Sequence, residues 1–100
     1  MKPILIKKGR LIDPEQGLDE ISDVLLVNGL VEAVGANLAG PEGATILEAR
    51  EFVVSPGFID LHCHLRDPGH RQKETVATGT AAAAHGGFTT LCAMPNTDPP

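Results

Sequence analysis

Two histidines that directly follow an apolar run are the residues of this chain best suited to chemistry. They are His62 and His64, in the segment Asp60-Leu61-His62-Cys63-His64-Leu65-Arg66. Because alternate side chains of a β-strand share one face, Asp60 and Arg66 are expected on the same side as both histidines. Burying imidazoles, a carboxylate and a guanidinium together costs free energy unless a ligand binds there. A divalent metal beside an anionic substrate would resolve that cost.

A metal is the first ligand to consider for this histidine pair. Imidazole nitrogen is a common zinc ligand, and two imidazoles on one strand face can converge on one ion. A zinc site needs at least three protein ligands, and the chain offers no convincing third, since His70 and His85 are expected on a loop and at a helix end. The competing interpretation is a pair of surface or hydrogen-bonded histidines. The position at the end of a strand favours the metal, because catalytic groups of barrel enzymes lie there.

Three further side chains could serve a site at this strand end. Arg66 is a candidate clamp for an acidic substrate, because guanidinium pairs bidentately with carboxylates; the alternative is an ion pair with Asp67 or Glu74. Asn96 follows the next predicted strand and could reach a substrate, although Asn in Pro-Asn-Thr is also an ordinary turn residue. Asp60 is expected deeper, where it would orient a metal ligand.

The first half of the chain, residues 1–54, is predicted to form a small antiparallel β layer. Asn28-Gly29 lies between two β-rich runs and favours a tight type I′ hairpin. The acidic stretch from Asp13 to Glu20 is expected to be a turn and a surface loop. Strands are expected at residues 4–7, 10–12, 24–27, 30–34, 45–49 and 52–54.

The second half, residues 55–100, has the pattern of a βαβ unit. A nearly continuous apolar strand at 58–65, suited to burial on both faces, precedes a helix at 74–85 and a strand at 88–94. The fold class is therefore α/β. One such unit cannot cover both faces of a parallel pair, and a (β/α)8 barrel needs about 250 residues. We expect the chain to be the N-terminal piece of a larger protein whose fold is incomplete here.

Composition excludes several classes of function. The apolar fraction of 42% suits a globular core, and a net charge of −5 without a basic stripe gives no support for nucleic-acid binding. No apolar stretch approaches the ~20 residues of a membrane span, so no membrane association and a cytoplasmic location are expected. Cys63 and Cys92 lie in apolar segments and are expected to be buried free thiols.

Three segments resemble the cyclic amidohydrolases. Ser-Pro-Gly-Phe-Ile-Asp-Leu-His-Cys-His-Leu-Arg-Asp-Pro-Gly at 55–69 is similar to the first barrel strand of that family, and residues 74–90 to its first helix and second strand. Met-Pro-Asn-Thr-Asp-Pro-Pro at 94–100 narrows the resemblance to dihydroorotases of the bacterial type. Allantoinases usually have Asn in place of Arg66, and hydantoinases lack both the Arg and the Met-Pro-Asn-Thr run. Arg50-Glu51 departs from the family, whose members often have a Gly turn there.

The resemblance implies a fold and a set of roles. The fold would be the start of a (β/α)8 metallo-dependent hydrolase barrel, preceded by a small antiparallel β-sandwich portion. His62 and His64 would bind one or two Zn²⁺ ions, with Asp60 behind them, and His64, Arg66 and Asn96 would hold the substrate. The reaction would be the interconversion of N-carbamoyl-L-aspartate and L-dihydroorotate in pyrimidine biosynthesis.

The resemblance also leaves alternatives open. The general base and a bridging Lys or Asp come from later strands in this family, so the 100 residues alone are expected to be inactive. Another cyclic amidohydrolase of the allantoinase or hydantoinase type is the first alternative. A non-catalytic scaffold for a transcarbamoylase is the second. A homodimer and a complex with a transcarbamoylase are the two candidate assemblies.

Overall fold

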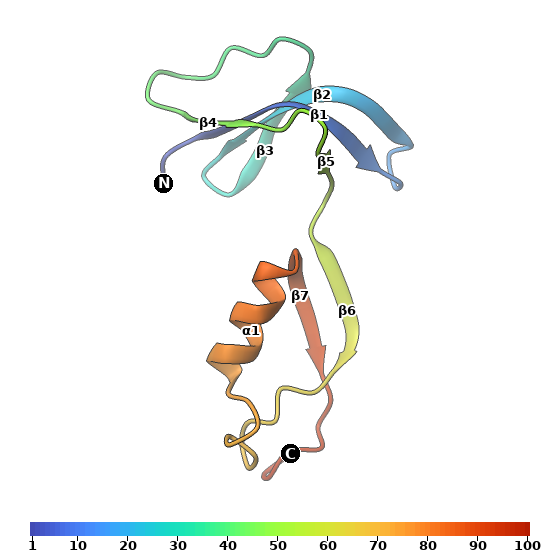
Figure 1. Ribbon diagram of the computed structural model, residues 1–100, viewed down its shortest axis with the longest axis vertical. Coiled ribbons are helices and arrows are strands. Elements are labelled where there is room, and N and C mark those ends of the chain that lie inside the picture. The colour runs from blue at the N-terminus through green and yellow to red at the C-terminus, as the bar shows by residue number, and fades with distance from the viewer. The chain divides into compact units, whose positions relative to one another are not determined.

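The computed structural model describes all residues from Met1 to Pro100, which form two compact units (Figure 1). We call Met1–Pro56 the β unit and Gly57–Pro100 the βαβ unit. No helix in either unit has the length and apolar character needed to cross a bilayer.

The β unit is a five-stranded mixed sheet. Its strands are β1 (Ile4–Asp13), β2 (Leu18–Val27), β3 (Leu30–Gly35), β4 (Thr45–Glu48) and β5 (Val53–Val54). The order is β3-β2-β1-β4, and β5 lies beside the second half of β1. β1, β2 and β3 are antiparallel neighbours, whereas β4 and β5 run parallel to β1 (Figure 1).

The prediction of an antiparallel layer is therefore wrong for the last two strands. After two reversals β3 already runs in the direction of β1, and the segment 36–44 brings the chain back so that Thr45 pairs with Ile4. A connection of this kind produces parallel neighbours. The expected loop up to Glu20 is also too long, because β2 begins at Leu18, opposite Asp13.

The Asn28-Gly29 hairpin is confirmed. Both residues have positive φ, 50° and 77°, and Val27 pairs with Leu30 across the turn. Positive φ at both central positions is the requirement of a type I′ turn, whose twist matches that of the flanking strands.

Apolar burial in the β unit is concentrated around β1. Leu5, Leu11, Val24 and Ala49 are buried. Leu5 is covered by the segment between β3 and β4, since a Cβ built on Gly40 would lie 3.1 Å from its side chain. Elsewhere the sheet leaves an open apolar hollow of about 260 Å³. Its lining includes Ile6, Val24 and Val34, which pair across three strands.

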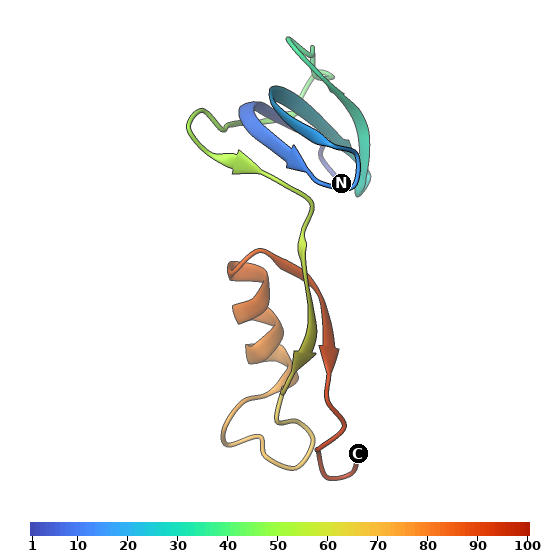
Figure 2. The ribbon, with the colours of Figure 1, turned by 90° about the vertical axis from the view of Figure 1, so that its right-hand side faces the viewer.

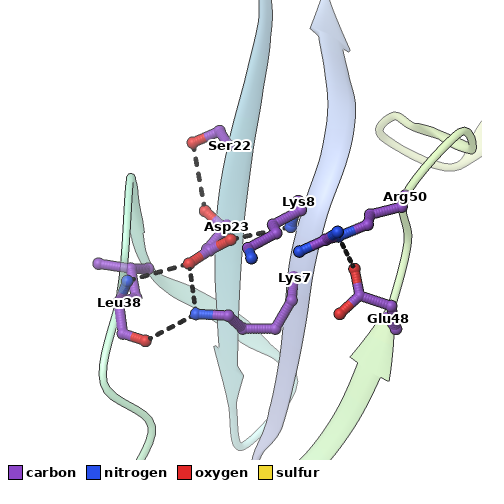
Figure 3. Close-up of polar contacts among 7 residues, drawn as sticks. All are labelled: Lys7, Lys8, Ser22, Asp23, Leu38, Glu48 and Arg50. Atoms are coloured by element: carbon purple, nitrogen blue, oxygen red, sulfur yellow. Dashed lines mark hydrogen bonds and ion pairs between the residues drawn. The ribbon is translucent and has the colours of Figure 1, made fainter.

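A buried carboxylate holds the irregular part of this sheet together (Figure 3). Asp23 is 2% exposed and accepts hydrogen bonds from Lys7 Nζ (2.8 Å), the Lys8 amide (2.8 Å) and the Leu38 amide (3.0 Å). Between Ile6 and Gly9, β1 has one residue more than the facing part of β2, and Lys8 there has a φ of 61°. Asp23 thus satisfies an amide that the bulge removes from the ladder.

The βαβ unit contains β6 (Phe58–Cys63), α1 (Val76–His85) and β7 (Phe88–Ala93). The two strands are parallel, and α1 lies against one face of the pair (Figure 2). The helix starts two residues later than predicted because Thr75 is its N-cap: the Thr75 hydroxyl accepts from the Thr78 amide at 3.1 Å. It ends at Gly86, and Gly87 follows with a φ of 89°, as expected of a glycine after a helix.

Burial of β6 on both faces is not observed. Ile59 is 61% exposed and Leu61 is 74% exposed, because β7 is the only strand beside β6 and α1 covers one face. The prediction of buried thiols is wrong for Cys92, which is exposed, while Cys63 is half-buried. Burial raises the pKa of the Cys63 thiol, and the charge of Asp60 adds to the effect.

Candidate metal and substrate site

The end of β6 contains a bulge at the residues of interest. Asp60 pairs with Leu91 and Cys63 with Ala93, so β6 has one residue more than β7 over this stretch. The His62 amide donates to Asp60 Oδ1 at 3.0 Å. Asp60 therefore satisfies a backbone donor at the irregularity and fixes the backbone of His62. The strand ends at Cys63, so the predicted alternation from Asp60 through Arg66 along one continuous strand is wrong.

The two imidazoles are neighbours. The ring centroids of His62 and His64 are 5.2 Å apart, with an angle of 70° between the ring planes. His62 is exposed at the end of β6, and His64 is half-buried in the loop that follows. Two imidazoles this close are suited to binding one metal ion together, and a zinc site would need further ligands. The structure contains no group of three or more His, Cys, Asp or Glu side chains able to hold a metal.

Asn96 lies against the second imidazole. His64 Nδ1 and Asn96 Oδ1 are 2.9 Å apart. An amide oxygen only accepts, so the contact places the proton on Nδ1 and leaves the Nε2 lone pair free for a metal. Histidine ligands of metals commonly donate their other ring N–H in this way. The same contact leaves the Asn96 amide group available as a donor to a substrate.

Arg66 lies in the loop after β6 and has a φ of 64°. Its carbonyl accepts from the His70 amide at 2.9 Å. The proposed alternative, an ion pair with Asp67 or Glu74, is not observed: the carboxylate of Asp67 pairs with Arg71 at 3.4 Å, and Arg66 takes part in no ion pair.

Two residues near this site, which the sequence indicated only as possible ion-pair partners of Arg66, have other contacts. Glu74 lines an open cavity of about 310 Å³ together with Asp60, Cys63 and His64. Asp67 accepts from the Val76 amide at the start of α1 at 3.0 Å, which ties the Arg66 loop to the helix. Asp67 lies nine residues before Val76, so no local sequence signal indicated this contact. His70 and His85 are both exposed, as expected.

The sequence model of the dihydro-orotase-like family matches residues 51–100, half of the chain and the part that contains both histidines, Arg66 and Asn96. The chain belongs to this family. It is 54% identical over 96 residues to the dihydroorotase of Geobacter sulfurreducens, covering 96% of this chain and 23% of that protein. It is 48% identical over 97 residues to the dihydroorotase of Solibacter usitatus, covering 97% and 22%. The chain thus spans less than a quarter of these dihydroorotases.

Solved structures of cyclic amidohydrolases show the same fold. The chain superposes on an L-hydantoinase from Arthrobacter aurescens with a TM-score of 0.82 and 29% identity, covering 100% of this chain and 22% of that one. A D-hydantoinase gives 0.77 and 34%, covering 89% and 19%. A dihydroorotase gives 0.57 and 30%, covering 69% and 18%. Hydantoinases and the dihydro-orotase-like family therefore share the folds of these elements.

Proposed function

We propose that this chain is part of a zinc-dependent cyclic amidohydrolase that interconverts N-carbamoyl-L-aspartate and L-dihydroorotate in pyrimidine biosynthesis. The observation that supports this most directly is the His62–His64–Asn96 arrangement at the ends of two adjacent parallel strands. Catalytic groups of (β/α)8 enzymes lie at such strand ends. In this proposal β6, α1 and β7 begin the barrel, and residues 1–54 belong to the β-sandwich portion.

His62 and His64 are proposed as ligands of one or two zinc ions. When bound, zinc supplies Lewis-acid polarisation of the ring carbonyl and activation of a water molecule. Asp60 positions His62 through its backbone, and the Asn96 carbonyl holds the tautomer of His64. The remaining ligands and the general base are proposed to lie outside these 100 residues, which alone are expected to be inactive.

Arg66 and Asn96 are proposed to hold the substrate carboxylate, with His64 beside them. A guanidinium without an ion-pair partner and an amide with a free donor are suited to a planar anion. Dihydroorotate has a carboxylate on its ring, whereas dihydrouracil does not, so the two compounds separate this proposal from the alternatives.

Activity of the full-length protein tests the proposal. We expect turnover of dihydroorotate, a KM for it about 50-fold higher in Arg66→Ala, and unchanged zinc content in that variant. The KM of Arg66→Lys, which keeps the charge and loses the bidentate geometry, should lie between that of the original protein and that of Arg66→Ala. Loss of zinc equal to the loss of activity in Arg66→Ala would instead give Arg66 a structural role. Metal analysis of His62→Ala and His64→Ala should show loss of zinc.

A hydantoinase-type enzyme is the second candidate, because the TM-scores to the two hydantoinases, 0.82 and 0.77, exceed the 0.57 to the dihydroorotase. Turnover of dihydrouracil or hydantoin in preference to dihydroorotate would favour a hydantoinase-type enzyme.

The intact His62 and His64 argue against a non-catalytic scaffold. A cytoplasmic location and assembly as a homodimer or with a transcarbamoylase remain parts of the proposal.

A further inference from the structure

The loops that follow β6 and β7 are joined at three successive points. The Met94 amide donates to the Cys63 carbonyl at 2.8 Å. His64 Nδ1 and Asn96 Oδ1 are 2.9 Å apart, and the Asp98 amide donates to the Pro68 carbonyl at 3.0 Å. Met94, Asn96 and Asp98, which are spaced two residues apart along the second loop, thus each contact the first loop. Arg66 lies between the second and third of these points, so its backbone is held relative to Asn96 from both sides.

A glycine makes the third point possible. Gly69 has a φ of 105°, and a Cβ built on it would lie 2.9 Å from both the Cβ and the amide nitrogen of Asp98. It would also lie 3.0 Å from the Asp98 carbonyl oxygen. Cβ atoms do not approach backbone this closely, so any other residue would push the two loops apart.

The Arg66 loop is braced independently of this contact. The His70 amide donates to the Arg66 carbonyl at 2.9 Å, and the Asp67 carboxylate accepts from the Val76 amide at 3.0 Å. Because the loop is fixed to the helix start, a displacement at Gly69 would be transmitted to the separation of the two loops instead of being absorbed within one of them.

We propose that Gly69 is a positioning residue that sets the distance between Arg66 and Asn96, and with it the recognition of the substrate carboxylate. This inference rests on the proposed function. Gly69 touches neither metal nor substrate in this proposal; it acts by allowing the loop that follows Arg66 to pack against the loop that follows Asn96. Two groups that hold the substrate carboxylate equally in the ground state and the transition state contribute uniform binding, so a small displacement of them raises KM more than it lowers kcat.

The test is Gly69→Ala in the full-length protein. We expect KM for dihydroorotate to rise about tenfold with kcat and zinc content within twofold of the original protein. In an Arg66→Ala background, Gly69→Ala should add little to KM, because the residue through which it acts is gone. Equal effects of Gly69→Ala with and without Arg66, or a fall in kcat with unchanged KM, would overturn the proposal.

Gly43→Ala is the matched control. Gly43 also has positive φ, 80°, but a Cβ there would meet no atom within 4 Å. It imposes backbone strain without a collision, so KM should not change. A KM rise in Gly43→Ala as large as that in Gly69→Ala would show that the effect is general destabilisation.

Two further measurements separate this inference from the proposed function. Hydrogen exchange of the Asp98 amide, which needs no substrate, should be faster in Gly69→Ala; unchanged protection would refute the loop contact even if the reaction is as proposed.

Thr97→Val is the replacement variant if Gly69→Ala does not fold. It removes the hydrogen bond from Thr97 Oγ1 to the Pro99 carbonyl (2.7 Å) in the second loop without adding bulk. We expect a KM about threefold higher with kcat retained; no change in KM would contradict the proposal.

Discussion

The two units differ in where they bury their residues. Seven of the eight buried residues lie in the β unit, around β1 and Asp23, whereas Gly79 is the only buried residue of the βαβ unit. The βαβ unit nevertheless contains every metal ligand and substrate contact that is proposed within this chain. The β unit thus has a buried core and no proposed site residue. The βαβ unit has the proposed site residues and leaves apolar side chains of β6 exposed. This contrast predicts that equivalent changes in the two units will have different consequences.

The largest effect is expected from Asp23→Ala in the β unit. The change leaves the amides of Lys8 and Leu38 and the ammonium of Lys7 without their acceptor, which should cost about 3 kcal/mol of unfolding free energy. Native-state hydrogen exchange in β1 and β2 measures this loss of unfolding free energy. The control is Asp19→Ala, which removes an ion pair with Arg10 in which both side chains are about half exposed, and should change little. Equal effects of the two changes would remove the distinction between a buried and a surface carboxylate.

Asp23 also makes the stability of the β unit depend on pH. The hydrogen bond from Lys7 holds the pKa of the Asp23 carboxyl below its usual value, with the Lys8 and Leu38 amides contributing. The folded state therefore binds this proton less tightly than the unfolded state. The stabilisation is present above about pH 4 and is lost as the pH falls through the lowered pKa. Exchange rates in Asp23→Ala should lack this component of the acid dependence.

A smaller effect is expected from Gly57→Ala in the βαβ unit. A Cβ at Gly57 would overlap the side chain of Thr89 on β7, so the start of β6 must shift, at a cost of about 2 kcal/mol. Combining it with Thr89→Ala should recover part of this loss. Gly86→Ala is the control, because a Cβ there would make only ordinary contacts, the nearest at 3.5 Å. Thermal unfolding of Gly57→Ala, Thr89→Ala, the double variant and Gly86→Ala measures the coupling between positions 57 and 89. Strictly additive effects of Gly57→Ala and Thr89→Ala would contradict this coupling.

The smallest effect is a gain in the β unit from Glu51→Gly. Glu51 has a φ of 67° in a turn closed by the Phe52 amide and the Ala49 carbonyl at 3.0 Å. Left-handed backbone costs a non-glycine residue about 1 kcal/mol, so glycine should stabilise the unit by about that amount. Glu51→Ala, which keeps the Cβ, should not. A denaturation midpoint that is unchanged in Glu51→Gly would show that the turn holds no such strain.

Local patterns predicted the elements well and their pairing less well. The Asn28-Gly29 hairpin and the βαβ unit follow from short sequence signals, and both are observed. The parallel placement of β4 and β5 could not be predicted, because it depends on which distant strand accepts their hydrogen bonds. Nothing around Asp23 marks it as the centre of a hydrogen-bond network, since its three donors come from two distant segments.

The sequence indicated which residues to consider for the candidate site, but not their geometry. Residue type and spacing indicated His62, His64, Arg66 and Asn96, and the structure brings His64 and Asn96 into contact. The bulge after Asp60 interrupts the simple alternation on which the shared face was predicted. The contact of Gly69 with the β7 loop depends on the packing of two backbones, which a single sequence does not display.

The bulge in β1 has a consequence for inherited change in this chain. β1 pairs with β4 before Lys8 and with β5 after Gly9, and Gly9 packs directly against Val54. In-frame loss of the Lys8 codon would remove the bulge and keep the pairs Ile6–Val24 and Gly9–Ser22, but it would also remove the amide that donates to the buried Asp23 carboxylate. A deletion in the exposed turn around Glu15 removes no such buried hydrogen bond. Length variation among related genes should therefore accumulate in that turn and be absent from the middle of β1.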